Sequence, residues 1–494
     1  MIVPIWFTSA VALLLLGLLT QSGGLTWWAP LAALLNASPL AYAVLRGQWP
    51  RGGYPTPVFL VISMWLLFQC PSMLVIDPLS RMVFIFSDES IFVGHLLFSG
   101  FTILVVHIAS TRVAAEAAWT LEPEGPLGFV ILVAVFIVAC AFSATIGVLN
   151  PYAGAVAPAA GSLASVFSGL TRHALQVGLA LCLFAALRWP SLRMLSYGAG
   201  FSLAAFVLLS ASRRAQLSNL ALCLVALRVF HIRLSIRRTI AIGGLVCISL
   251  LTVVVYRNQV SARGAFGFGI VADSVIKGDQ GLVDATLTNL ETRYWYAQQY
   301  FAAVSNFLES GPAMAGTYLE GIVRAVPSLI WPQKNDIANR YTIEEALWNT
   351  HRFPRIDLGP TPWLQAVFEF GWLGLAVAAI VYGVVLRQVQ RTLTRVSSFR
   401  SFFLSGALFS IIALAESRID TLILDARDPI LLFLAISFVA KTPSNKGASC
   451  GARIGGHVGP VLSHAQLGPM GELLVSPARH DVTIPSQVVG DESP

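Results

Sequence analysis

Long apolar runs, separated by short polar segments, recur along most of the chain. A helix needs about 20 mainly apolar residues to cross the hydrocarbon core of a bilayer, and backbone groups left unpaired in lipid are costly. Each such run predicts a membrane-spanning helix, and the whole pattern predicts an all-α polytopic membrane protein with about twelve transmembrane helices. The qualifying runs are 3–20, 25–45, 55–76, 91–109, 127–149, 173–187, 194–211, 215–230, 239–256, 364–386, 399–416 and 428–440.

The same pattern divides the chain into four parts. Residues 1–256 hold the first nine predicted spans and residues 364–440 hold the last three. Between them, residues 257–363 form a long connecting segment with helices of its own. Apolar side chains at three- and four-residue steps over 287–308 predict an amphipathic helix that lies on the membrane surface. The final part, 441–494, is rich in Gly, Pro and Ser and predicts a disordered tail.

Composition supports the membrane prediction. Hydrophobic residues make up 56% of the 494 positions and charged residues only 12%, with a mean hydropathy of +0.72. Soluble domains carry about 25% charged residues, so this chain has too little charge to cover a water-facing surface. The net charge of +7 is dispersed in short clusters between apolar runs, a pattern that suits membrane orientation rather than nucleic-acid binding.

Arginines are shared unequally between alternate short loops, and the positive-inside rule uses this bias to predict orientation. It places both termini in the cytoplasm and the segment 257–363 outside. The richer set of loops holds Arg46, Arg51, Arg112, Arg188, Arg193, Arg228, Arg233, Arg237, Arg238, Arg387, Arg391, Arg395 and Arg400. The poorer set holds Arg81, Arg172, Arg213, Arg214, Arg418 and Arg427.

The sequence contains no phosphate-binding GxxxxGK[ST] loop, no HExxH zinc motif, no GxSxG nucleophile elbow and no dinucleotide fingerprint. Its cysteines and histidines lack the spacing of a metal site. These absences argue against ATP hydrolysis, zinc proteolysis and serine-esterase chemistry. They leave proteins that move a solute, and enzymes whose substrate arrives already activated in the membrane.

Two adjacent arginines, Arg213 and Arg214, interrupt the apolar stretch 194–230 at its predicted outer turn. An arginine near the bilayer centre costs about 2.5–3.5 kcal/mol on insertion scales, and less toward the interface. An anionic phosphate would compensate this cost, because guanidinium groups donate paired hydrogen bonds to its oxygens. The alternative is that both arginines extend to lipid headgroups.

A second charged cluster follows the eleventh predicted span. In it, Arg418 is a candidate for a second phosphate contact and Glu416 for a hydrogen-bond acceptor or base. The sequence continues with Asp425-Ala426-Arg427-Asp428. The alternative is a local ion-pair network that orders a short loop.

The end of the long segment combines charges with prolines, glycines and tryptophans. Trp331 and Trp363 suit the aromatic belt at a membrane interface. Glu369, at the outer end of a span, is a candidate for a buried carboxylate, either reactive or paired with an arginine. His351 is the only histidine of this segment, and a lone histidine is more often a packed residue than a catalyst.

At these positions the sequence resembles the Wzy-type polysaccharide polymerases, also called O-antigen or oligosaccharide repeat-unit polymerases. The resemblance covers most of residues 1–440. It rests on the layout of the spans, on the Leu-Leu-Ser-Ala-Ser-Arg-Arg turn that ends at Arg214, and on the element from Pro327 to Lys334. That element leads into Thr361 and the Glu-Phe-Gly-Trp-Leu-Gly sequence that begins at Glu369.

The resemblance implies a membrane glycosyltransferase of GT-C-like architecture in the bacterial inner membrane, with its active site facing the periplasm. It would polymerise undecaprenyl-diphosphate-linked oligosaccharide repeat units into O-antigen, capsule or exopolysaccharide. Its expected partners are that lipid-linked oligosaccharide, membrane lipids and a chain-length regulator protein. No cofactor, metal or nucleic acid is expected.

The resemblance also assigns roles within the site. The diphosphate-binding residues would be Arg213, Arg214, Arg293 and Arg418. The catalytic carboxylate would come from Glu369, Asp357 or Glu416. The substrate loop would contribute Arg324, Lys334 and His351.

Two alternatives remain open. The related O-antigen ligases resemble one another around a histidine shortly before a Gly-x-x-Gly span. Here His351 lies 20 residues before Gly371, which favours a polymerase. A secondary transporter or flippase would carry charges or helix breaks in the middle of its spans, whereas the charges here concentrate at predicted outer ends.

Overall fold

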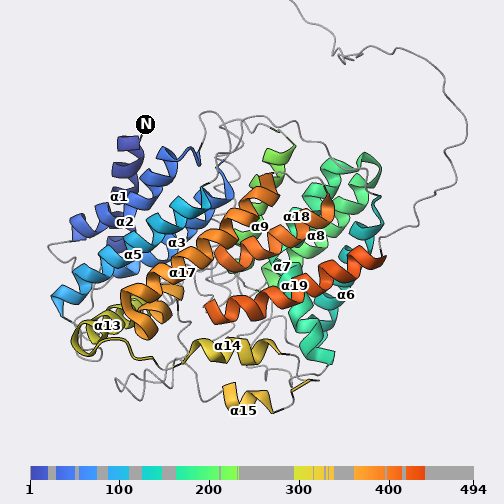
Figure 1. Ribbon diagram of the computed structural model, residues 1–494. Coiled ribbons are helices and arrows are strands. Elements are labelled where there is room, and N and C mark those ends of the chain that lie inside the picture. Colours follow the sequence, from blue (N-terminus) through green and yellow to red (C-terminus); the bar gives the residue numbers. More distant parts are fainter. Residues whose placement is uncertain are drawn as a thin grey trace, which may run out of the picture. The chain divides into compact units, whose positions relative to one another are not determined.

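The computed structural model describes most of the apolar runs and part of the long connecting segment (Figure 1). The described residues are 2–19, 29–49, 55–74, 87–110, 125–146, 163–210, 213–230, 232, 294–314, 316–326, 330–331, 333–338, 361–394, 398–413 and 419–439. The predicted span 239–256 and the predicted disordered tail 441–494 lie outside these ranges.

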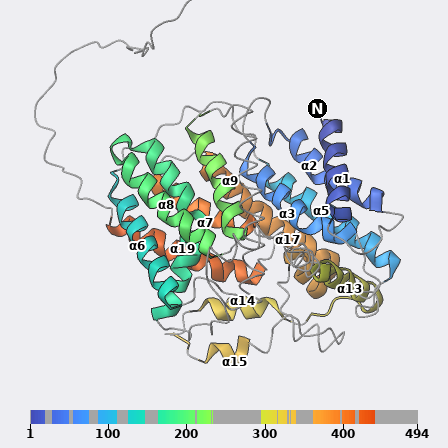
Figure 2. The same cartoon turned by 180° about the vertical axis from the view of Figure 1, so that it is seen from behind.

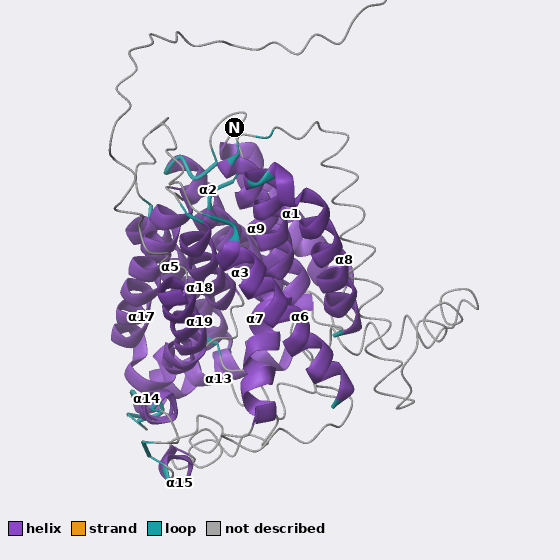
Figure 3. Ribbon diagram, turned by 90° about the vertical axis from the view of Figure 1, so that its right-hand side faces the viewer, coloured by secondary structure: helices purple, strands orange, loops and turns teal. Residues whose placement is uncertain are grey.

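Helix is the only regular secondary structure within the described ranges, and Figure 3 shows helices joined by loops. A short 3-10 helix, η1 (Pro190–Leu192), joins α7 to α8. The α-helices are α1 (Ile2–Leu19), α2 (Ala29–Leu45), α3 (Pro57–Leu74), α5 (Asp88–Ala109), α6 (Leu127–Thr145), α7 (Leu163–Arg188), α8 (Arg193–Leu209), α9 (Arg213–Val229), α13 (Tyr294–Ser310), α14 (Tyr318–Ala325), α15 (Lys334–Ala338), α17 (Pro362–Thr394), α18 (Phe399–Ala413) and α19 (Ile419–Val439).

Every predicted span except 239–256 coincides with one of these helices. Several are long and apolar enough to cross a membrane, so an all-helical protein suited to a membrane is confirmed. Within the described residues, five helical segments meet that standard, and the predicted number of about twelve spans stays a prediction. The five segments are Asp88–Ala109, Leu127–Thr145, Phe167–Arg188, Pro190–Leu208 and Pro362–Leu393.

The start of α5 shows how local sequence sets a helix boundary. The hydroxyl of Ser87 accepts a hydrogen bond from the backbone N–H of Ser90 at 3.1 Å, which satisfies one of the free donors of the first turn. Asp88 and Glu89 place negative charge beside the positive end of the helix dipole. The helix therefore begins with this polar cap, three residues before the predicted apolar run.

The helices pack in two groups that α18 connects (Figures 1 and 2). In one group α5 contacts α2, α3, α13 and α17, and in the other α7 contacts α6, α8 and α9. The helix α18 touches α3 and α17 as well as α7. The indole Nε1 of Trp65 donates to the carbonyl of Ile412 at 3.0 Å, so α3 satisfies a carbonyl in the last turn of α18.

The helix α17 is sharply bent at Gly371, where the backbone is non-helical with φ +62°. Trp363 and Tyr382 lie 19 residues apart, which corresponds to about 28 Å along a straight helix. Yet the centroids of both rings lie within 6 Å of the Trp65 ring, at 5.7 and 5.9 Å. The bend therefore separates a short arm (362–370) from a long arm (372–394), and both arms pack on Trp65.

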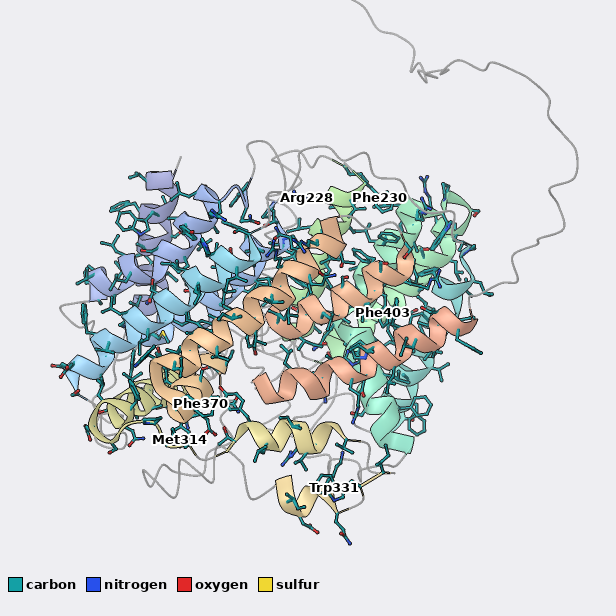
Figure 4. The ribbon with its side chains drawn as sticks, viewed as in Figure 1. Arg228, Phe230, Met314, Trp331, Phe370 and Phe403 are labelled. Carbon is teal, nitrogen blue, oxygen red and sulfur yellow. The ribbon has the colours of Figure 1, made fainter. Side chains whose placement is uncertain are left out.

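Two structural ends of the bundle can be distinguished from the described contacts. Ring contacts of Phe399 with Trp189 and Phe184, and of Phe184 with Phe230, bring together the ends of α7 and α9 and the start of α18. Arginines of the richer set of loops, including Arg188 and Arg228, lie at this end, which we call the arginine-rich end. Figure 4 shows Phe230 there and Trp331 at the opposite end.

The opposite end carries the described helices of the connecting segment, α13, α14 and α15 (Figures 1 and 2). We call it the loop end. Arg213, in the first turn of α9, and Arg172, near the start of α7, also belong to it, because these helices run from the loop end to the arginine-rich end. For Arg188 and Arg228 at one end, and for Arg172 and Arg213 at the other, the two ends of the bundle match the two sets of loops. The orientation in a membrane stays a prediction.

The connecting segment packs one of its helices against the bundle. The helix α13 begins at Tyr294, and the earlier part of the predicted surface helix lies outside the described residues. Tyr300, Phe301 and Val304 are completely buried, and the Tyr300 hydroxyl donates to the carbonyl of Gly94 at 2.9 Å. Because α13 packs against α3, α5 and α17 in this way, its apolar face is covered by the helix bundle. Its position at the membrane surface stays a prediction.

Two predictions are corrected. Trp363 is 1% exposed and packs on Trp65, Phe98 and Phe101, so it is a core residue rather than part of an interfacial belt. The charged sequence at 425–428, predicted as a loop, lies within α19. Its charges can be helical because Asp425 pairs with Arg172 of α7 and Arg427 pairs with Asp428 within α19.

Candidate functional site

Four cationic side chains gather at the loop end, on α7, α14, α15 and α19. Arg172 of α7 forms an ion pair with Asp425 of α19, with 2.8 Å between Nη1 and Oδ1. Two residues further along α19, Arg427 pairs with its neighbour Asp428 at 2.9 Å. The helix α14, which carries Arg324, packs on α19. The two predicted substrate-loop residues that are described, Arg324 and Lys334, therefore both belong to this cationic cluster.

Lys334 is the most enclosed of these cations, with 6% of its surface exposed. Its Nζ donates to the carbonyl oxygens of Arg324, at 2.6 Å, and of Val326. Burial lowers the pKa of Lys334, and the positive charges of Arg427 and Arg324 lower it further. Lys334 therefore lies in the positive field of two arginines, while Arg172 and Arg427 each also pair with an aspartate. An anion bound beside Lys334 would relieve the repulsion that it experiences.

Glu369, predicted as a candidate for a buried carboxylate, is fully buried, and that part of the prediction is confirmed. Its partners are backbone amides rather than an arginine. The carboxylate accepts from the N–H of Gly316 at 3.1 Å and from the N–H of Thr317. The amide of Gln365, one helical turn earlier, donates to the Thr317 hydroxyl at 3.1 Å. The short arm of α17 thus holds the turn that leads into α14.

Backbone bonds reinforce this junction. The carbonyls of Phe368 and Glu369, freed by the bend at Gly371, accept from the N–H groups of Ala313 and Met314 at 2.9 and 3.2 Å. Figure 4 shows Met314 beside Phe370 at this place. A broken helix inside a membrane protein needs such replacement partners, and here the connecting segment supplies them.

His173 is a residue that the sequence reasoning missed. It is 2% exposed on α7, its Nδ1 has no hydrogen-bond partner, and it lies close to the charges of Arg172 and Asp428. The Asp428 carboxylate rests against the backbone of Gly169, one turn earlier on α7. An ionisable pair at the start of a predicted span, Arg172-His173, was the available signal, because such residues inside membranes are usually functional.

The two arginines predicted to bind diphosphate, Arg213 and Arg214, occupy the first turn of α9, and the structure describes their backbone only. The helices α7 and α9 run parallel. The Asn219 side chain binds the backbone of Leu175 and Leu179, and the ring of Phe230 meets that of Phe184 edge to face. This register places the first turn of α9 level with residues 169–173 of α7, beside Arg172 and His173.

The remaining predicted site residues lie outside the described ranges. They are Arg293, Asp357, His351, Glu416 and Arg418. In sequence, Arg293 directly precedes α13 and Arg418 directly precedes α19. Within the described residues, no group of three or more His, Cys, Asp or Glu side chains could hold a metal ion.

The arrangement can attract an anion at the loop end and neutralise negative charge that develops there. Comparison with known proteins does not identify a family for this chain. No family model, no curated protein and no solved structure matches the chain.

Proposed function

We propose that this protein is a bacterial inner-membrane glycosyltransferase that polymerises undecaprenyl-diphosphate-linked repeat units at the periplasmic face. The observation that carries the proposal is the cationic cluster of Arg172, Arg324, Lys334 and Arg427 at the loop end. The first turn of α9, with Arg213 and Arg214, lies level with it. The product would be O-antigen, capsule or exopolysaccharide, and a chain-length regulator would be a partner.

The chemistry of such a reaction matches this arrangement. A sugar linked to a diphosphate is already activated, so the enzyme must neutralise the departing diphosphate and align two lipid-linked substrates. Guanidinium groups bind phosphate oxygens through paired hydrogen bonds, and fixed cations stabilise the charge that develops on the leaving group. Neither task requires a metal or cofactor, so we keep the expectation of none.

The acceptor hydroxyl also needs a base. Glu369 is buried and already accepts two backbone N–H groups, so it is poorly placed to take a proton from a sugar. We therefore assign the base to Asp357 or Glu416, and give Glu369 a structural task at the site.

The test is the glycan profile of a strain that lacks the gene and is complemented with variants. Arg213→Ala and Arg427→Ala should stop chain extension, leaving single repeat units on the acceptor, with normal protein level. Arg387→Ala, which removes an exposed arginine on the long arm of α17, is the matched control and should restore full-length chains. Long chains retained on the carrier would indicate a ligase instead.

One observation favours a different class. Secondary transporters often contain broken helices whose ends face a substrate, and α17 is broken at Gly371 with its short arm buried. A transporter or flippase therefore stays the second candidate. Normal surface glycans in the deletion strain, together with altered transport of a solute or lipid-linked sugar, would favour it and overturn the polymerase proposal.

A further inference from the structure

The helix α14 has the backbone groups of both ends satisfied from elsewhere in the chain. A helix leaves free N–H groups at its start and free carbonyls at its end, which side chains usually cap locally. At the start of α14, Thr317 makes no capping bond with its side chain. The N–H groups of Thr317 and of the preceding Gly316 are bound instead by the carboxylate of Glu369, on the short arm of α17.

The other end of α14 is held by an ammonium group. Lys334, the first residue of α15, donates from Nζ to the carbonyls of Arg324 and Val326, in the last turn of α14 and directly after it. Negative charge at the start and positive charge at the end both complement the helix dipole. Both charges therefore stabilise α14, which is a short helix of eight residues.

Glu369, which binds the start of α14, lies on a segment that is packed in the core. Residues 361–369 of the short arm are all buried, and Trp363 packs in the aromatic cluster around Trp65. Gln365 adds a bond from the same arm to the Thr317 hydroxyl. The start of α14 is thus tied to the centre of the bundle, while its end reaches the cationic cluster.

We propose that Glu369 and Lys334 are positioning residues that clamp α14 by its two ends and thereby fix Arg324 relative to α19, the helix that carries Arg427. The clamp itself follows from the contacts of the described residues. Its use in holding an anion site rests on the proposed function. Glu369 would then act on the reaction through Arg324, without touching substrate.

The clamp can be tested without any activity assay. Spin labels on cysteines introduced at Ile322 of α14 and Leu431 of α19, both exposed, report the distance between these helices in an otherwise cysteine-free protein. We expect a narrow distance distribution in the parent. Glu369→Gln and Lys334→Met should each broaden it about twofold or more. Glu309→Gln, an exposed glutamate on α13, is the matched control and should leave it unchanged.

A second variant removes the backbone N–H that Glu369 accepts from at Thr317. Thr317 has φ −62°, which proline adopts, so Thr317→Pro deletes the donor N–H, together with the hydroxyl that Gln365 binds, and leaves Glu369 in place. It should broaden the distribution as Glu369→Gln does. Unchanged distributions in well-behaved Glu369→Gln and Thr317→Pro proteins would overturn the clamp.

Activity separates the clamp from the proposed function. If Arg324 serves polymerisation, Glu369→Gln should raise KM for the lipid-linked substrate, and it should add little further loss to Arg324→Ala. A loss of kcat in Glu369→Gln with an unbroadened distribution would make Glu369 a catalytic residue and overturn the proposal. A broadened distribution with normal polymerisation would leave the clamp standing and overturn its role in that function.

Discussion

The backbone of Gly374 lies directly against the carbonyl oxygen of Ala366, although both residues belong to one helix. In a straight helix residues eight apart are separated by about 12 Å, so this contact exists because α17 bends at Gly371. A Cβ on Gly374 would overlap the Ala366 carbonyl. The bend brings the short arm into the core and places Glu369 where it can bind the start of α14.

The bend itself depends on Gly371. With φ +62° and ψ −142° its backbone lies in a region that is nearly closed to residues with a Cβ, and a Cβ there would also overlap the ring of Phe307. Gly371→Ala should therefore lower the free energy of unfolding by about 1–3 kcal/mol or more, measured by denaturation of the solubilised protein. Gly100→Ala, in open space on α5, is the control. It should leave stability equal or higher, because alanine favours helix by about 1 kcal/mol.

Trp65 connects four helices, and its indole N–H is the donor to Ile412. Trp65→Phe removes that donor and part of the ring, so a carbonyl is left without its partner and the aromatic cluster loses contacts. We expect a loss of about 1–3 kcal/mol in the free energy of unfolding. Trp372→Phe, at a position 64% exposed, should change it by less than about 0.5 kcal/mol. Equal effects of the two substitutions would contradict the central role of Trp65.

Lys334 predicts a pH dependence of stability. Its pKa is lowered in the folded protein by burial and by Arg427 and Arg324, from an unfolded value near 10.5. Between the lowered pKa and 10.5 the unfolded chain binds more protons, so stability rises with pH through that window. The free energy of unfolding of the parent, relative to Lys334→Met, should therefore increase as the pH rises through that window toward 10.5. If the difference in free energy of unfolding between the parent and Lys334→Met stays constant or falls as the pH rises, the folded state favours the charged form of Lys334.

The helical runs and the burial of Glu369 could be predicted from the sequence, because each depends mainly on the hydrophobicity of the surrounding segment. Apolar runs of sufficient length must be helical in lipid, and eleven predicted spans coincide with described helices. The burial of Glu369 was also predictable, since a carboxylate at the end of an apolar run has little water around it. Its partners were not, because Gly316 and Thr317 lie more than 50 residues away in sequence.

The amino-acid sequence by itself determined the class of protein, the helical runs and the unequal distribution of arginines, because hydrophobicity and charge act on each segment wherever it lies. Only the tertiary structure decided that Trp363 is a core residue, that α13 is inserted among α3, α5 and α17, and that Arg172, Arg324 and Arg427 meet at one end. Those outcomes depend on which helices pack against one another. That choice is made by packing and by satisfying buried backbone groups across long stretches of chain, and no segment encodes it alone.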